Sequence, residues 1–241
     1  MKCQATILFL LCLTSSALLQ LTFTVPVMDN SAPGSPLEIS GTASFTELIV
    51  ANSATSCSNF RIEARNVSEK GIVLLVASFD EAGPHGPGTH HVIQIDHFFW
   101  GDIAPETSFV LTRSRSDRRM CASSINPLMP AAELKADVSV QYVQFVDGST
   151  FGDEATAKDI LGMRPIILDA LRRLDNTSDK KEFLALLAQK IQPDEADRFL
   201  ETFRRTQKTR GTVAARAQVH AGVSVAEGRA LALRPVQAAE K

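Results

Sequence analysis

The sequence predicts an antiparallel β-sandwich with immunoglobulin-like layering, followed by an α-helical C-terminal segment. Three observations support this fold class: residues 36–152 hold several short strand-like runs, Gly- and Pro-rich turns separate these runs, and the apolar spacing becomes helical after Gly152. The chain has 241 residues, 44% of them hydrophobic, and a formal net charge of −2. This composition is typical of one or two compact domains, and it gives no overall positive field, so we expect no nucleic-acid partner.

The first 20 residues are interpreted as a signal peptide. Lys2 precedes the apolar stretch ILFLLCLTSSALL, and residues 15–17 offer small side chains for cleavage. An uncleaved membrane anchor is the alternative, although the apolar stretch is short for a membrane span. We therefore expect an exported protein, periplasmic or extracellular, whose mature chain has no membrane span.

Residues 21–35 are rich in Pro, Gly and Ser, which predicts a linker.

Export determines how the cysteines are interpreted. Cys3 and Cys12 leave with the signal peptide, so the mature chain keeps only Cys57 and Cys121. An even pair in an oxidising compartment favours a disulfide, which would stabilise the fold by about 4 kcal/mol in the chain-entropy model. Two separate buried thiols are the alternative, and no flanking motif indicates a catalytic cysteine.

Within residues 36–152, the segment SNFRIEARN alternates between apolar and charged residues, which is typical of a strand with one face in water. The turn VSEKG and the apolar run IVLLVASF follow it, and together they predict an antiparallel hairpin. In the later run LKADVSVQYVQFV, the apolar parity changes near Tyr142, which predicts a β-bulge. The immunoglobulin comparison extends only to layering, because Trp100 lies far beyond Cys57 and Arg119 stands where a tyrosine corner needs Tyr.

Residues 153–208 predict two or three amphipathic helices, because apolar residues recur there at helical spacing. Pro165 predicts a break or kink, Ser178 an N-cap, and Pro193 the first position of the last helix. Residues 209–241 are rich in Ala and Val without a steady period, so we expect a weakly ordered tail.

The stretch VQFVDGSTFGDEATAKDI at 143–160 resembles a ligand loop. An EF-hand that begins at its DG aspartate would place Phe151 at a ligand position and Lys158 in place of the bidentate glutamate. No Gly-Lys-Ser/Thr follows, which excludes a Walker loop. The stretch therefore predicts a tight turn at 147–148 and a helix N-cap at Asp153.

A histidine cluster offers one alternative function. His85, His90, His91 and His97 lie within a span of thirteen residues and could bind zinc or copper, as a metal carrier or a metal-dependent hydrolase. Their spacing matches no metal-site template that we tested. Exposed loop histidines are the simpler interpretation.

An arginine-rich loop offers another alternative. Arg113, Arg115, Arg118 and Arg119 could bind phosphate or carboxylate groups of an anionic envelope polymer. A solvated loop whose charges balance local acids is the simpler interpretation. The hydrolase motifs Gly-x-Ser-x-Gly and His-Glu-x-x-His are absent from the sequence. We therefore predict no catalytic residue and no cofactor.

The order of three motifs resembles a group of uncharacterised exported bacterial proteins with a small β-sandwich domain. The motifs are the Asn66-x-Ser68-x-Lys70-x-Ile72 spacing, the segment VQFVDGSTFGD and the following AKDILGMR. The resemblance covers roughly residues 55 to 165 and implies no function. Our leading expectation is a non-catalytic exported binding or scaffold protein, in which the C-terminal helices pack on the sandwich or recruit a protein or envelope partner.

Overall fold

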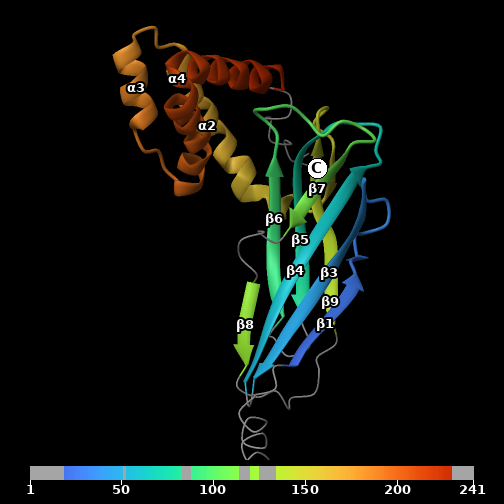
Figure 1. The fold of residues 1–241 in the computed structure, drawn as a ribbon. Coiled ribbons are helices and arrows are strands. Elements are labelled where there is room, and N and C mark those ends of the chain that lie inside the picture. The colour runs from blue at the N-terminus through green and yellow to red at the C-terminus, as the bar shows by residue number, and fades with distance from the viewer. Residues whose placement is uncertain (1–18, 51–52, 83–87, 114–119, 125–133, 230–241) are drawn as a thin grey trace, which may run out of the picture.

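The computed structural model describes residues 19–50, 53–82, 88–113, 120–124 and 134–229. Two five-stranded, mainly antiparallel sheets form its β part, and a helical segment follows them (Figure 1). Sheet A contains β1 (Leu19–Pro26), β3 (Leu37–Val50), β4 (Ser53–Asn66), β7 (Ser108–Arg113) and β8 (Met120–Ser124). Sheet B contains β2 (Met28–Asp29), β5 (Ile72–Ala82), β6 (Thr89–Asp96), β9 (Lys135–Phe145) and β10 (Thr150–Gly152).

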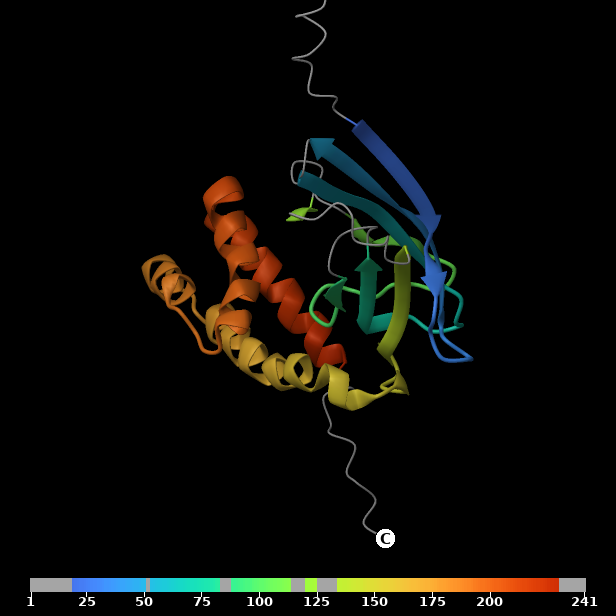
Figure 2. The ribbon, with the colours of Figure 1, turned by 90° about the horizontal axis from the view of Figure 1, so that it is seen from below.

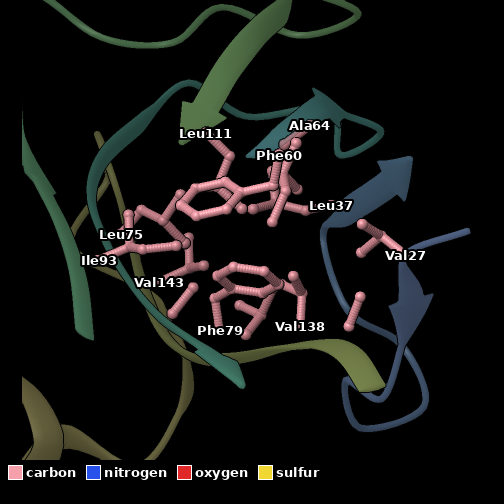
Figure 3. Packing of buried hydrophobic residues seen from close by; sticks show 14 of the residues in the cluster. Val27, Leu37, Phe60, Ala64, Leu75, Phe79, Ile93, Leu111, Val138 and Val143 are labelled. Atoms are coloured by element: carbon pink, nitrogen blue, oxygen red, sulfur yellow. The ribbon is translucent and has the colours of Figure 1, made fainter. Parts of the chain in front are cut away.

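The two sheets face one another across a shared apolar core. Phe60 of β4 and Phe79 of β5 point toward each other across this interior, with ring centroids 4.8 Å apart (Figure 3). Leu37, Ile62 and Leu111 of sheet A pack in the same cluster as residues of sheet B. The predicted pair of packed sheets followed by helices is therefore present, because the period-2 pattern gives each sheet one apolar face to bury.

The predicted hairpin between β4 and β5 is wrong, because these strands belong to different sheets. The chain crosses from one sheet to the other after Asn66, whose Nδ2 donates to the carbonyl oxygens of Lys70 at 2.8 Å and Ile103 at 2.9 Å. β5 then becomes a central strand of sheet B, between β6 and β9. A five-residue turn between two strand patterns does not by itself reveal whether the strands pair or cross.

The predicted bulge in β9 is confirmed. The β5–β9 register pairs Val76 with Tyr142 but the next residue, Ala77, with Val140. Val140 therefore faces the core between the sheets, whereas Tyr142 packs on the other face of sheet B. An extra residue in one strand shifts the side chains beyond it to the opposite face, as the change of apolar parity indicated.

Residues 21–35 are not a linker as predicted, since β1 and β2 occupy most of them. β1 pairs with β3 over its whole length, from Leu19 opposite Ile49 to Pro26 opposite Thr42. β2 makes a short parallel pairing with β9. The edge strand β1 tolerates Pro26, because one side of an edge strand needs no hydrogen-bond partner.

The helical segment consists of η1 (Glu154–Ala157), α2 (Lys158–Asp175), α3 (Lys180–Ala188) and α4 (Asp194–Gly228). It lies beside sheet B (Figures 1 and 2). Ala157 and Ile160 cover Leu74, Val76 and Tyr142 on the outer face of that sheet. Sheet B is thus covered on both faces, which explains why β5 is an almost continuous apolar run.

Three details of the helices differ from the predictions. The N-cap of α3 is Asp179 and not Ser178, since the Asp179 side chain accepts from the Glu182 backbone N–H. Helix α2 continues through Pro165. The predicted tail is helical on both sides of Gly211, whose φ of 86° is non-helical, and the helix reaches Gly228 because small residues of α4 pack closely against α2 and α3. Residues 230–241 lie outside the described part. None of the described helices is long and apolar enough to cross a membrane.

Candidate functional site at the Glu81 end of the sandwich

Three polar side chains from three strands meet inside one end of the sandwich. Ser58 of β4 donates its hydroxyl to Glu81 Oε1 of β5 at 3.0 Å, and this bond joins sheet A to sheet B. His91 of β6 places Nε2 at 3.4 Å from the same carboxylate oxygen. We call Ser58, Glu81 and His91 the Glu81 site.

Strand periodicity explains why these side chains lie inside the molecule. Ser58 shares its parity with the buried Phe60 and Ile62, and Glu81 shares its parity with the buried Phe79. His91 has the parity of Ile93, another member of the core between the sheets. Most inward positions of β4, β5 and β6 hold apolar residues, but at this end of the sandwich they hold Ser58, Glu81 and His91.

The Glu81 carboxylate is 5% exposed, and only one of its two oxygens has a hydrogen-bond partner. Oε1 accepts from Ser58, whereas Oε2 is buried and has no partner. Buried carboxylates usually have partners for both oxygens, because an unpaired buried polar atom costs about 1–3 kcal/mol. The Oε2 atom therefore keeps an unused capacity to accept a hydrogen bond.

Aromatic rings line the site beside Glu81. The His91 imidazole stacks on Phe79 with ring centroids 5.6 Å apart and an interplanar angle of 17°. Phe60 lies 5.9 Å from His91 and 4.8 Å from Phe79 between centroids. Glu47 is fully buried and has the same strand parity as Phe45 on β3.

The order of contacts in the Glu81 site differs from that of a catalytic triad. In a catalytic triad, the histidine lies between the hydroxyl and the acid, where it can take the hydroxyl proton. Here Glu81 lies between Ser58 and His91, and its Oε1 contacts both. The carboxylate therefore binds the Ser58 hydroxyl proton and leaves the imidazole without a direct role in activating it.

The predicted histidine cluster does not converge in the described part of the chain. His90 and His91 are adjacent on β6 and point to opposite faces, and His90 Nδ1 lies 2.8 Å from Asp80 Oδ1. His97 follows the far end of β6, and His85 lies outside the described residues. No group of three or more His, Cys, Asp or Glu side chains suited to a metal ion occurs among the residues described.

The arginine loop lies mostly outside the structure. Arg113 is exposed at the end of β7, whereas Arg115, Arg118 and Arg119 lie in the undescribed residues 114–119. Anion binding by this loop stays a prediction.

The cysteines lie on neighbouring strands. The β4–β8 register places Cys57 directly opposite Cys121. Residues directly opposite in an antiparallel pair have Cα atoms about 4.5–5.5 Å apart, within the range that a disulfide spans. The Cys121 side chain lies outside the described part, so the bond itself stays a prediction.

The stretch at 147–153 forms a turn and a helix start, as predicted. Asp147 Oδ1 accepts from the backbone N–H and the hydroxyl of Ser149, and Gly148 adopts a φ of 83° that favours glycine. The hydrogen bonds from Lys70 and Ser149 hold the pKa of Asp147 well below its ordinary value. Asp153 caps η1 by accepting from the Ala155 backbone N–H.

Arg164, a second buried charged residue, joins the helices to sheet B through hydrogen bonds. Arg164 of α2 is 1% exposed and donates to both carboxylate oxygens of Asp96, at 3.1 and 2.9 Å, and to Gln144 Oε1. Its guanidinium lies over the Phe98 ring at 4.4 Å. We call Arg164, Asp96, Gln144 and Phe98 the Arg164 anchor.

Sequence reasoning missed Ser58 and Glu81 as site residues. The available signal was their parity: each continues the inward positions of its strand with a polar residue where Phe60 and Phe79 predict an apolar one. That Ser58 and Glu81 meet depends on the packing of sheet A on sheet B, which strand patterns do not specify.

No protein-family model, curated protein or solved structure matches this chain.

Proposed function

We propose that this chain is an exported, non-catalytic binding protein whose ligand occupies the Glu81 site. The observation that carries this proposal is the buried Glu81 carboxylate, which is held across the two sheets by Ser58 and has one oxygen without a partner. The helical segment serves as a fixed support, since Arg164 ties it to sheet B and its apolar stripes pack on one another. The sheets provide an immunoglobulin-like layered frame for the site.

Export is part of this proposal. The apolar N-terminal stretch after Lys2 supports a signal peptide over residues 1–20. In an oxidising compartment, Cys57 and Cys121 would form a disulfide between β4 and β8, beside Ser58. Two measurements on protein recovered after export test this point. N-terminal sequencing should start near residue 21, and thiol alkylation should modify neither cysteine before reduction.

Binding is tested by thermal denaturation of the exported protein with probes of three charge types. Spermidine, maltose and succinate represent cationic, neutral and anionic ligands. A ligand at a hundredfold excess over its Kd stabilises a protein by about 2.7 kcal/mol. We expect one probe type to raise the Tm of the natural chain and to leave the Tm of Glu81→Gln unchanged. If no probe shifts the Tm in a Glu81-dependent manner, the proposed site is wrong.

The non-catalytic part of the proposal is tested at Ser58. Ser58→Ala should leave hydrolysis of p-nitrophenyl acetate at the level of the natural chain, because the Ser58 proton is bound by Glu81. A large loss of hydrolysis in Ser58→Ala, without loss of the folded state, would identify Ser58 as a nucleophile and contradict the proposal.

A further inference from the structure

We infer that the Glu81 site recognises an alkylammonium ion, which is presented by a free polyamine or by a lysine side chain of a peptide. This inference rests on the proposed binding function and adds the chemical class of the ligand. It depends on two features of the site: a half-paired buried carboxylate and adjoining aromatic rings.

The Glu81 carboxylate determines which charge the ligand must carry. Glu81 Oε2 is a buried acceptor without a partner, so the group that completes it must donate a hydrogen bond. A cationic donor also compensates the buried negative charge, and hydrogen bonds between ionised groups are about twice as strong as neutral ones. An anionic ligand would meet repulsion from Glu81 and would leave Oε2 unpaired.

The aromatic rings favour an organic cation. Phe79 and Phe60 lie beside the imidazole that contacts Glu81, with Phe79 stacked on His91. Ammonium groups bind to the faces of aromatic rings, and an acid combined with such rings is a recurring way to recognise them.

Metal ions fit the site less well. Zinc needs three or four N, S or O ligands, and calcium needs six or more oxygens. Around Glu81, the described residues offer no group of three His, Cys, Asp or Glu side chains with suitable geometry. The free acceptor oxygen of Glu81 can take one N–H of an ammonium group, whereas it would supply only one of the three or more ligands that a metal ion needs.

Isothermal titration calorimetry on the exported full chain tests the inference. The probes are n-butylammonium chloride, spermidine and the peptide Gly-Lys-Gly, with N-butylacetamide as the uncharged analogue and zinc chloride as the metal probe. We expect saturable binding of the ammonium probes and at least tenfold weaker binding of N-butylacetamide, because the charge-assisted bond to Glu81 is lost. The stronger of spermidine and Gly-Lys-Gly identifies a free polyamine or a peptide lysine as the source of the ammonium.

Matched variants identify the carboxylate that binds. Glu81→Gln keeps the side-chain shape and removes the charge, so ammonium binding should fall about tenfold or more. Glu38→Gln removes a carboxylate from the exposed outer surface of sheet A, where it pairs with Arg65, and should leave binding unchanged. Phe79→Leu should weaken the ammonium probes about two- to tenfold while the protein stays folded by circular dichroism.

The outcomes separate this inference from the proposed function. Glu81-dependent binding of maltose or succinate, without binding of the ammonium probes, would retain the binding function and overturn the ligand class. Zinc binding that Glu81→Gln abolishes would also overturn the ligand class. Equal loss of ammonium binding in Glu81→Gln and Glu38→Gln would show non-specific charge attraction and contradict the inference.

The chain's own arginines provide a last test. Arg119 immediately precedes Met120, which pairs with Ser58 in the β4–β8 register. Replacement of Arg115, Arg118 and Arg119 by Ala should leave ammonium affinity within about twofold, as expected for an external ligand. A rise of tenfold or more would identify an arginine of this chain as the natural occupant of the site and overturn the inference.

Discussion

Arg164 and Glu81 are both buried charged residues next to sheet B, but their surroundings differ. Arg164 is completed by Asp96 and Gln144 and is covered by Phe98. Glu81 is paired through Oε1 alone, and its second oxygen has no partner. The two sites lie near opposite ends of β5, since Asp96 pairs with Leu74 and Thr89 pairs with Glu81. At about 3.3 Å per residue, they are roughly 23 Å apart along the strand.

This difference distinguishes a structural charge from a candidate binding charge. A fully paired buried ion fixes the position of one element on another, and its removal leaves its partners unpaired. A half-paired buried ion stabilises the fold less than it would with a complete set of partners, and its free oxygen can accept a hydrogen bond from a ligand. The predictions below test whether the two sites differ in this way.

The largest expected effect follows loss of the Arg164 anchor. Arg164→Ala removes the buried guanidinium that joins α2 to Asp96 and Gln144, and we expect a loss of about 3–5 kcal/mol in the free energy of unfolding, measured in urea. Arg172→Ala is the matched control, because Arg172 sits on the same helix in an exposed pair with Glu227 and should cost about 1 kcal/mol or less. Similar losses in both variants would show that Arg164 contributes no more to stability than the exposed pair of Arg172 and Glu227.

Tyr142 reports on the same contact between α2 and sheet B. Burial, with a smaller contribution from Glu154, raises the pKa of Tyr142 from 10.0 to about 12. Between these values, the unfolded chain loses the phenol proton first, so stability should fall with rising pH by about 1.4 kcal/mol per unit. This stabilisation is complete below pH 10 and is lost as the pH rises toward 12.

Two measurements check the Tyr142 prediction. Tyr142 is the only tyrosine in the chain, so tyrosinate absorbance reports its ionisation directly. Urea unfolding of Tyr142→Phe should lack the part of the pH dependence that belongs to this side chain. A natural-chain titration with a midpoint near pH 10 would show that the helices do not shield this face of sheet B.

The two sites are compared most directly by neutralising the acid in each of them, Glu81 in one site and Asp96 in the other. Glu81→Gln should change the free energy of unfolding by less than about 1 kcal/mol, or raise it, because a half-paired buried charge is removed. Asp96→Asn at the other end should lose about 1.5–3 kcal/mol, because the bidentate pair with Arg164 is broken. Equal losses would place Glu81 among the structural charges.

The smallest effect is expected at an exposed pair. Lys70 Nζ lies 2.7 Å from Asp147 Oδ2, and both side chains are 47% exposed. Lys70→Met should cost about 0.2–1 kcal/mol, and the cost should shrink in high salt. Because the pKa of Asp147 is lowered in the fold, this stabilisation is present above pH 3.8 and is lost as the pH falls below that value. Salt-independent unfolding at neutral pH would contradict this account.

Local patterns predicted much of the fold but little of the candidate site. The parity change in β9 predicted a bulge that the register at Tyr142 and Val140 confirms. The DG turn and the Asp153 cap also follow from residues close in sequence. The pairing of β4 with β5 was predicted wrongly, because alternation shows that a strand exists and not which strand lies beside it.

The sequence also failed to predict the helix after residue 208, where we expected a weakly ordered tail. Ala215, Val219 and Val223 offer too little apolar area to predict a stable helix from sequence. They are buried because α2 and α3 provide a surface that small residues approach closely, and Gly222 lies near Leu171 and the Phe99 carbonyl. Tertiary packing supplied the stability that local propensity lacked.

The sequence by itself determined most of the core strands, the helices before residue 209, the turn at 147–148 and the apolar faces, because these depend on neighbours a few residues apart. Only the tertiary structure decided that Ser58, Glu81 and His91 meet, and that Arg164 is fully paired while Glu81 is not. Those facts depend on how two sheets and a helix pack, and packing joins residues whose separation along the chain carries no periodic signal.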